Sequence, residues 1–141
     1  EEHYSRRIAK AIVEAREKAP IKTGKALAAI IEGAVPGPYR RGKTHAATKS
    51  FQGLRIAVND EFDTLETFIN SAFMHLRPGG RLAIISFHSL EDRIVKLAFK
   101  AFVHDQKGVL VTKKPVVASE VELKTNPRAR SAKLRVIEKI V

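Results

Sequence analysis

Apolar residues recur every three or four positions through the first third of the chain, a spacing that predicts amphipathic helices. We expect the first helix over residues 3–18, where the apolar positions are Tyr4, Ile8, Ile12 and Ala15. Thr23 is the expected N-cap of a second helix over about 24–34, because a threonine hydroxyl can accept a hydrogen bond from a backbone N–H of the first turn. The first part of the chain is therefore predicted to be helical.

Glycine and proline then interrupt the helical spacing. They are frequent in residues 33–43, which predicts a basic loop. From about Ala46 the helical spacing resumes and continues to Leu76, as one long helix or as two helices that meet near Asn59. The sequence Pro78-Gly79-Gly80 is a turn signal that ends this segment.

The remaining residues alternate between short apolar runs and one further helix. We expect strands near 82–87, 109–112 and 133–141, with a helix over about 89–103 after the first strand. Ser119 and Glu122 have the spacing of a capping box, so a short helix should begin there and end before Asn126-Pro127. The order is helices first, then β-α-β-α-β, and the predicted fold class is α/β.

Composition limits the possible functions. The 141 residues, of which 44% are hydrophobic, can form one ordinary domain with a core. The absence of cysteine excludes a disulfide framework and a thiolate metal site. No apolar run approaches the roughly 18–20 residues that span a bilayer, so no membrane partner is expected. The net charge of +11 instead favours a polyanionic partner such as a nucleic acid.

Basic residues gather in two stretches of the chain. No acidic residue lies between Glu32 and Asp60, and the basic candidates for RNA contact in this gap are Arg40, Arg41, Lys43, His45, Lys49 and Arg55. The second stretch is Arg128, Arg130, Lys133 and Arg135, of which the first three are candidates for RNA contact. Such side chains would bind phosphates and position an RNA without reading its sequence. The alternative is a basic surface that only water covers.

Polar and ionisable residues collect where the strand at 82–87 ends. Ser86, His88, Asp92 and Arg93 lie at this corner. In open α/β sheets, ligands bind just beyond the carboxyl ends of the strands, so these four residues are the candidate catalytic residues. Each also has a structural alternative: His88 can make a local hydrogen bond, and Asp92 can complement the dipole of the following helix and pair with Arg93.

Several kinds of site are excluded at this corner. A serine hydrolase needs glycines around its nucleophile, and none surrounds Ser86. The five histidines are scattered without a His-x-x-x-His pair, so no metal site is predicted. Neither a Gly-x-Gly-x-x-Gly sequence nor a P-loop occurs, and no residue of this chain is expected to bind a cofactor phosphate.

Three long motifs resemble one known family. They are the segments Thr48–Glu61 (TKSFQGLRIAVNDE), Pro78–Lys96 (PGGRLAIISFHSLEDRIVK) and Asn126–Arg135 (NPRARSAKLR). Together, and in this order, they closely resemble the bacterial small-subunit ribosomal RNA N4-cytidine methyltransferases. The resemblance extends over nearly the whole chain.

The resemblance implies an S-adenosylmethionine-dependent, cytoplasmic enzyme with a Rossmann-like catalytic domain and a helical insertion. Residues 1–55 would be part of the insertion, which recognises the substrate, and residues 56–141 the last third of the class I methyltransferase sheet. The three predicted strands would be the fifth, sixth and seventh. The seventh would run antiparallel between the other two. The corner from Ser86 to Arg93 would border the pocket of the target cytidine, with ribosomal RNA as the partner.

The resemblance also implies what this chain does not contain. The family's donor-binding motifs, a glycine-rich loop after the first strand and acidic residues after later strands, have no counterpart here. The chain begins with Glu1-Glu2 and its only methionine is Met74. We therefore expect a carboxyl-terminal fragment that is inactive by itself and that dimerises to cover an exposed sheet face. The alternative is a non-catalytic RNA-binding module that retains the second half of the fold.

Overall fold

The computed structural model describes residues 2–141 and divides into two compact units. The amino-terminal unit is Glu1–Asn59 and the carboxyl-terminal unit is Asp60–Val141. The boundary lies a few residues beyond the expected position at residue 55. Among the described residues, no helix combines the length and the apolar character needed to cross a bilayer.

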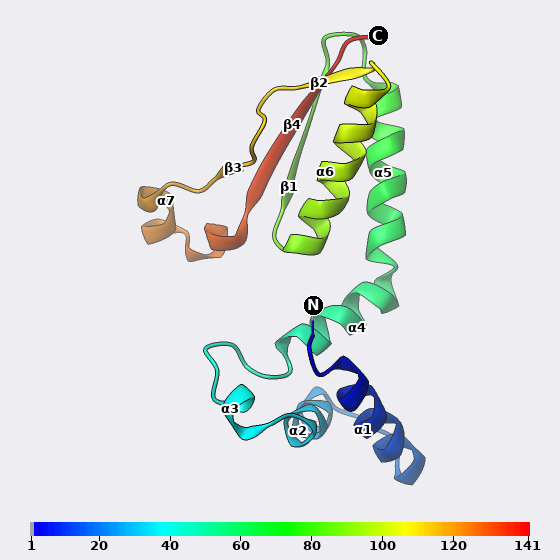
Figure 1. The fold of residues 1–141 in the computed structure, drawn as a ribbon, viewed down its shortest axis with the longest axis vertical. Coiled ribbons are helices and arrows are strands. Elements are labelled where there is room, and N and C mark those ends of the chain that lie inside the picture. Colours follow the sequence, from blue (N-terminus) through cyan, green and yellow to red (C-terminus); the bar gives the residue numbers. More distant parts are fainter. Residues whose placement is uncertain (1) are drawn as a thin grey trace. The chain divides into compact units, whose positions relative to one another are not determined.

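The amino-terminal unit is helical, as the spacing predicts. Its helices are α1 (Ser5–Lys18), α2 (Gly24–Ala34), α3 (Gly37–Arg40) and α4 (Thr48–Asn59) (Figure 1). The hydroxyl of Thr23 accepts a hydrogen bond from the N–H of Ala26 at 3.1 Å, which confirms the predicted N-cap. The core of this unit consists of Ile8, Ile31, Ala34, Val35, Ala46 and Ala47.

One detail of the helical region differs from the prediction, and another decides between the two predicted alternatives. The predicted loop at 33–43 contains α3, because Pro36 and Pro38 supply backbone angles that suit the start of a helical turn. The long helical pattern resolves into two helices, because Asp60 has a left-handed backbone with φ of 50°. A residue in that conformation cannot continue a right-handed helix.

The carboxyl-terminal unit contains a sheet and the helices that cover it. Its elements are α5 (Glu61–His75), β1 (Arg81–Ser86), α6 (Ser89–His104), β2 (Gly108–Leu110), β3 (Val116–Val117), α7 (Glu120–Thr125), the 3₁₀-helix η1 (Pro127–Ser131) and β4 (Lys133–Lys139). The hydroxyl of Ser119 accepts a hydrogen bond from the N–H of Glu122 at 3.2 Å, as the capping pattern predicts. Strand β3 was not predicted, and β2 is shorter than the expected 109–112.

Strand β4 is the centre of the sheet. It pairs antiparallel with β1 on one side, and with β2 and β3 on the other. Strands β1 and β2 therefore point the same way without being neighbours. All strand pairs within residues 2–141 are antiparallel, and the structure is a mixed α/β arrangement with a small antiparallel sheet.

Side-chain burial alternates along β1 and shows which face of the sheet is covered. Leu82 and Ile84 join the core that α5 and α6 form with β4, where the rings of Phe73 and Phe102 stack at 3.9 Å. Figure 1 shows α5 and α6 running side by side along the strands. Ile85 points to the other face, and 56% of its surface is exposed. The helices thus cover one face, and apolar side chains of the described residues remain exposed on the other.

Candidate functional site

His88 forms the corner between β1 and α6 and acts as the N-cap of α6. Its Nδ1 accepts a hydrogen bond from the backbone N–H of Glu91 at 3.2 Å, so the local structural role foreseen for His88 is present. A ring nitrogen that accepts a hydrogen bond carries no proton, so in the neutral imidazole the proton lies on Nε2. The side chain is only 16% exposed. His88 is therefore held in one orientation with an Nε2–H donor directed inwards.

Two carboxylates lie beside the Nε2 atom of His88. Glu91 Oε1 is 3.2 Å away, although the geometry does not make a hydrogen bond, and Nε2 is buried without another partner. A carboxylate oxygen of Glu61, at the start of α5, lies within 4.8 Å of both groups. The other oxygen of Glu91 accepts a hydrogen bond from the backbone N–H of Phe87 at 2.9 Å, which fixes this carboxylate. The corner thus places one N–H donor near two carboxylates.

The chemistry of this trio does not suit a metal ion. Glu61, His88 and Glu91 are close enough to share one ion. However, the nitrogen that would bind it is Nε2, which carries the proton as long as Nδ1 accepts from Glu91. Metal binding would move the proton to Nδ1, where it would face another N–H. A metal ion at Nε2 would therefore cost the hydrogen bond that caps α6.

Asp92 also lies in the first turn of α6, and its carboxylate contacts strand β4. Its carboxylate is 10% exposed and accepts hydrogen bonds from Arg135 Nε at 2.7 Å and Nη2 at 3.1 Å, and from Lys133 Nζ at 3.3 Å. The hydrogen bond from Arg135 holds the pKa of Asp92 below its usual value, against the effect of burial. The carboxylate of Asp92 therefore connects α6 to β4, and its hydrogen bonds come from Lys133 and Arg135.

The other two corner candidates differ in exposure. Ser86 is buried, and its hydroxyl donates a long hydrogen bond of 3.5 Å to the backbone oxygen of Lys133. Arg93 lies next to Asp92 on α6 and is exposed. The structure thus brings Ser86, His88 and Asp92 to the same end of β1, with His88 alone facing the two glutamates.

The basic candidates of the amino-terminal unit fall into two groups. Arg40, Arg41 and Lys43 are exposed on and after α3. Both ring nitrogens of His45, by contrast, contact other groups of the protein. Its Nε2 lies 2.8 Å from a carboxylate oxygen of Glu32, and its Nδ1 accepts a hydrogen bond from the backbone N–H of Ala47. Lys49 and Arg55 lie on α4 and also interact with other groups of the protein. The exposed trio is thus the part of this stretch best placed for contact with an anion.

The basic candidates of the carboxyl-terminal unit surround η1. Arg128 and Arg130 belong to this short helix and are exposed. Lys133 begins β4 and is 40% exposed, but its ammonium group is bonded to Asp92. Arg135, which the candidate set omitted, makes the stronger contact with the same carboxylate. The signal for Arg135 was present in the sequence, since it alternates with Lys133 on the same side of a predicted strand.

Comparison with known proteins gives a consistent result. The family model described as the MraW methylase family matches residues 1–140. The protein "Ribosomal RNA small subunit methyltransferase H" of Synechococcus elongatus is 52% identical over 141 residues, which are all of this chain and 46% of that protein. The proteins of the same name from Synechocystis sp. and Lawsonia intracellularis are 56% and 47% identical and are covered to 44% and 50%. The chain thus spans about half the length of the curated relatives it matches.

Proposed function

Because this chain belongs to the MraW methylase family, we propose that it forms part of an S-adenosylmethionine-dependent ribosomal RNA methyltransferase. One observation carries the proposal: relatives with this name match the chain over its entire length at about half identity. The finer proposal is that the methyl group goes to the exocyclic N4 of a cytidine in small-subunit ribosomal RNA. The net charge of +11 suits a partner of this kind.

The sheet topology supports a placement within the catalytic domain. Strand β4 lies between β1 and β2 and runs antiparallel to both. We propose that β1, β2 and β4 are the fifth, sixth and seventh strands of a Rossmann-like sheet. The amino-terminal unit, Glu1–Asn59, would then be part of the helical insertion domain that recognises the substrate.

The corner at His88 offers groups that complement a cytosine. The Watson–Crick edge of cytosine has an N4 amino donor beside the N3 acceptor. His88 Nε2–H and Glu91 Oε1, 3.2 Å apart, are a donor beside an acceptor. In the proposal, His88 donates to the ring and a glutamate accepts the N4–H, which holds the weakly nucleophilic nitrogen in line with the methyl group. Since Nε2 is buried, side chains around the imidazole have to move as the base enters.

S-adenosylmethionine would supply the electrophilic methyl group. Within residues 2–141 the glycine pair at Gly79-Gly80 precedes β1, whereas a glycine-rich loop that holds a nucleotide follows a strand. We therefore assign no donor-binding residue in this chain. Calorimetry on the 141-residue chain is expected to detect no stoichiometric binding of S-adenosylmethionine, and tight binding would contradict this assignment.

The test of the function uses the intact protein that contains this chain. Small ribosomal subunits that lack the modification are incubated with the protein and labelled S-adenosylmethionine, and the nucleosides are separated after digestion. We expect label in N4-methylcytidine, and His88→Ala should lower the rate by about 10²-fold or more. Label in another nucleoside would overturn the N4 assignment. Binding of RNA without any methylation would support the alternative, a non-catalytic RNA-binding module.

A further inference from the structure

A second candidate site lies on the carboxyl-terminal unit, and none of the four corner candidates lines it. Helix α6, strand β4 and the residues after β2 enclose a small pocket of about 30 Å³. Its floor is apolar and includes the buried ring of Phe99. Four cationic side chains line it: Lys96 and Lys100 from α6, Lys113 from the segment after β2, and Arg135 from β4. No acidic side chain lines this pocket.

The three lysines of this pocket have no internal partner. Within residues 2–141 no carboxylate forms an ion pair with Lys96, Lys100 or Lys113, and all three side chains are exposed. Lys96 and Lys100 are four residues apart on one face of α6, a spacing at which like charges repel each other. Folding alone gives no reason for this concentration of positive charge. A bound anion would offset the repulsion.

Arg135 is already oriented for such an anion. Its side chain is 14% exposed, and Asp92 holds the Nε and Nη2 atoms. The Nη1 atom keeps its two N–H groups, and it is not among the buried side-chain atoms that lack a partner. A guanidinium fixed on one edge loses little further freedom when its other edge binds an anion. The ion pair between Asp92 and Arg135, which joins α6 to β4, therefore also orients a cationic side chain that lines the pocket.

We propose that this pocket binds one phosphate of an RNA backbone. The space of about 30 Å³ suits roughly two or three water-sized atoms, which matches the oxygens of one phosphate and is small for a nucleobase. Contacts of this kind position an RNA without reading its sequence. The proposal rests on the proposed function, because that function requires an RNA partner. It adds Lys96, Lys100, Lys113 and Arg135, none of which was among the RNA candidates of the sequence.

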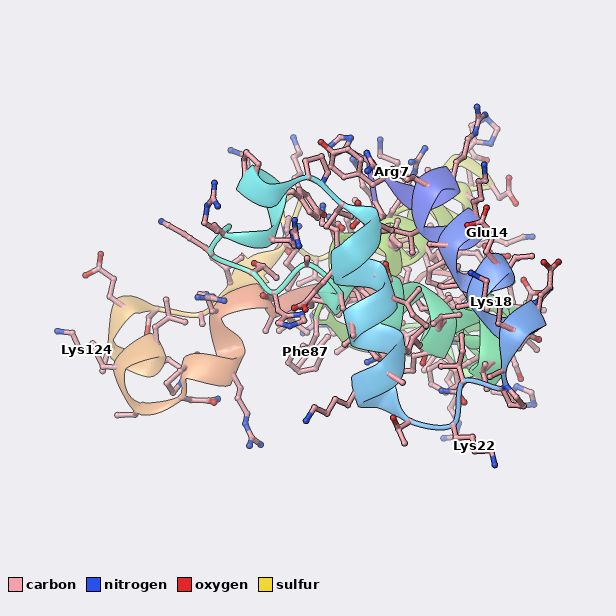
Figure 2. All side chains as sticks on the ribbon, turned by 90° about the horizontal axis from the view of Figure 1, so that it is seen from below. Arg7, Glu14, Lys18, Lys22, Phe87 and Lys124 are labelled. Carbon is pink, nitrogen blue, oxygen red and sulfur yellow. The ribbon has the colours of Figure 1, made fainter. Side chains whose placement is uncertain are left out.

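The experiment measures binding of a fluorescent single-stranded RNA oligonucleotide to the 141-residue chain, by anisotropy, between about 50 and 200 mM KCl. The pocket variant carries Lys96→Gln, Lys100→Gln and Lys113→Gln. The control variant carries Lys22→Gln, Lys25→Gln and Lys124→Gln, which remove the same charge from exposed sites outside the pocket. Figure 2 shows Lys22 and Lys124 pointing away from the ribbon. Circular dichroism confirms that both variants are folded.

The pocket variant is expected to bind at least about tenfold more weakly, and its logarithmic salt slope should be about 0.7 smaller, since the pocket neutralises one phosphate of the single strand. The control variant should stay within about twofold of the unchanged chain. Equal weakening of both variants would overturn the pocket and leave the proposed function standing. An unchanged chain that binds no RNA, or that binds anionic lipid vesicles in its place, would overturn the pocket, and methylation by the intact protein would then decide the function separately.

Discussion

Asp92 pairs with two cations of β4 and is buried. Its carboxylate accepts three hydrogen bonds from these cations. Asp92→Ala leaves the guanidinium of Arg135 without its partner, and removing one member of a buried pair costs about 3 kcal/mol or more. Urea denaturation should show this loss, whereas Glu120→Ala, at an exposed position of α7, should be nearly neutral. A loss below about 1 kcal/mol would contradict the buried-pair account.

The stabilisation that Asp92 contributes should also depend on pH. The pKa of Asp92 is lowered in the folded protein, first by the hydrogen bond from Arg135, so its contribution is fully present above the unfolded pKa of about 3.9. It is lost as the pH falls through the lower folded pKa. The difference in unfolding free energy between the unchanged protein and Asp92→Ala should therefore be constant near neutral pH and shrink below about pH 4. A difference that grows on acidification would contradict this sign.

The hydroxyl of Tyr39 allows a second test by pH, in the amino-terminal unit. Its hydroxyl donates a hydrogen bond of 2.7 Å to Glu2, and this bond raises the pKa of Tyr39 to about 12. The bond stabilises the unit at pH values below the usual tyrosine pKa of about 10, and this stabilisation disappears as the pH rises through 12. In a Tyr4→Phe background, where Tyr39 is the only tyrosine, tyrosinate absorbance should have its midpoint near 12. Adding Glu2→Gln should lower that midpoint, and an unchanged midpoint would refute the role of Glu2.

Strand β2 begins with a glycine that lies close against β4. A Cβ at Gly108 would lie 2.9 Å from Ile137 Cδ1 and 3.0 Å from the backbone oxygen of Glu138. Gly108→Ala should therefore push β2 away from β4 and lower the unfolding free energy by about 1–3 kcal/mol. Gly53→Ala is the control, because α4 has open space there and alanine favours a helix by about 1 kcal/mol. Thermal unfolding followed by circular dichroism should show opposite shifts, and two equal shifts would argue against the close approach.

At the scale of the whole molecule, the open face of the sheet bears on self-association. Ile85 and Val109 are exposed on the face opposite α6, and β1 has a strand partner on one side only among residues 2–141. We propose that two copies of the 141-residue chain associate through this face and edge, since exposed apolar strands favour pairing. Light scattering should give a dimer mass that Ile85→Lys lowers. Val58→Lys, at an exposed site of the other unit, should have no effect. A monodisperse monomer for the unchanged chain would contradict the proposal.

The residues of the candidate site could be predicted only in part from the sequence. Ser86, His88 and Asp92 could be identified because they follow one another directly after a predictable strand. Glu61 could not, because it precedes His88 by a helix and a strand, and no local pattern relates the two. The pairing of Asp92 with Arg135 was likewise hidden, since it depends on β4 returning beside β1.

The sequence by itself determined the helices other than α3 and η1, the strand before the corner, the caps at Thr23 and Ser119, and the family, because these depend on neighbours within a few residues or on long matching motifs. Only the tertiary structure decided that Asp60 divides a continuous helical pattern, that Glu61 meets His88, and that Lys113 joins two lysines of α6 around one pocket. The physical reason is that these features depend on a backbone angle and on the packing of residues far apart in the chain. Hydrophobic spacing specifies which face of an element is buried, but not which distant side chain lies against it.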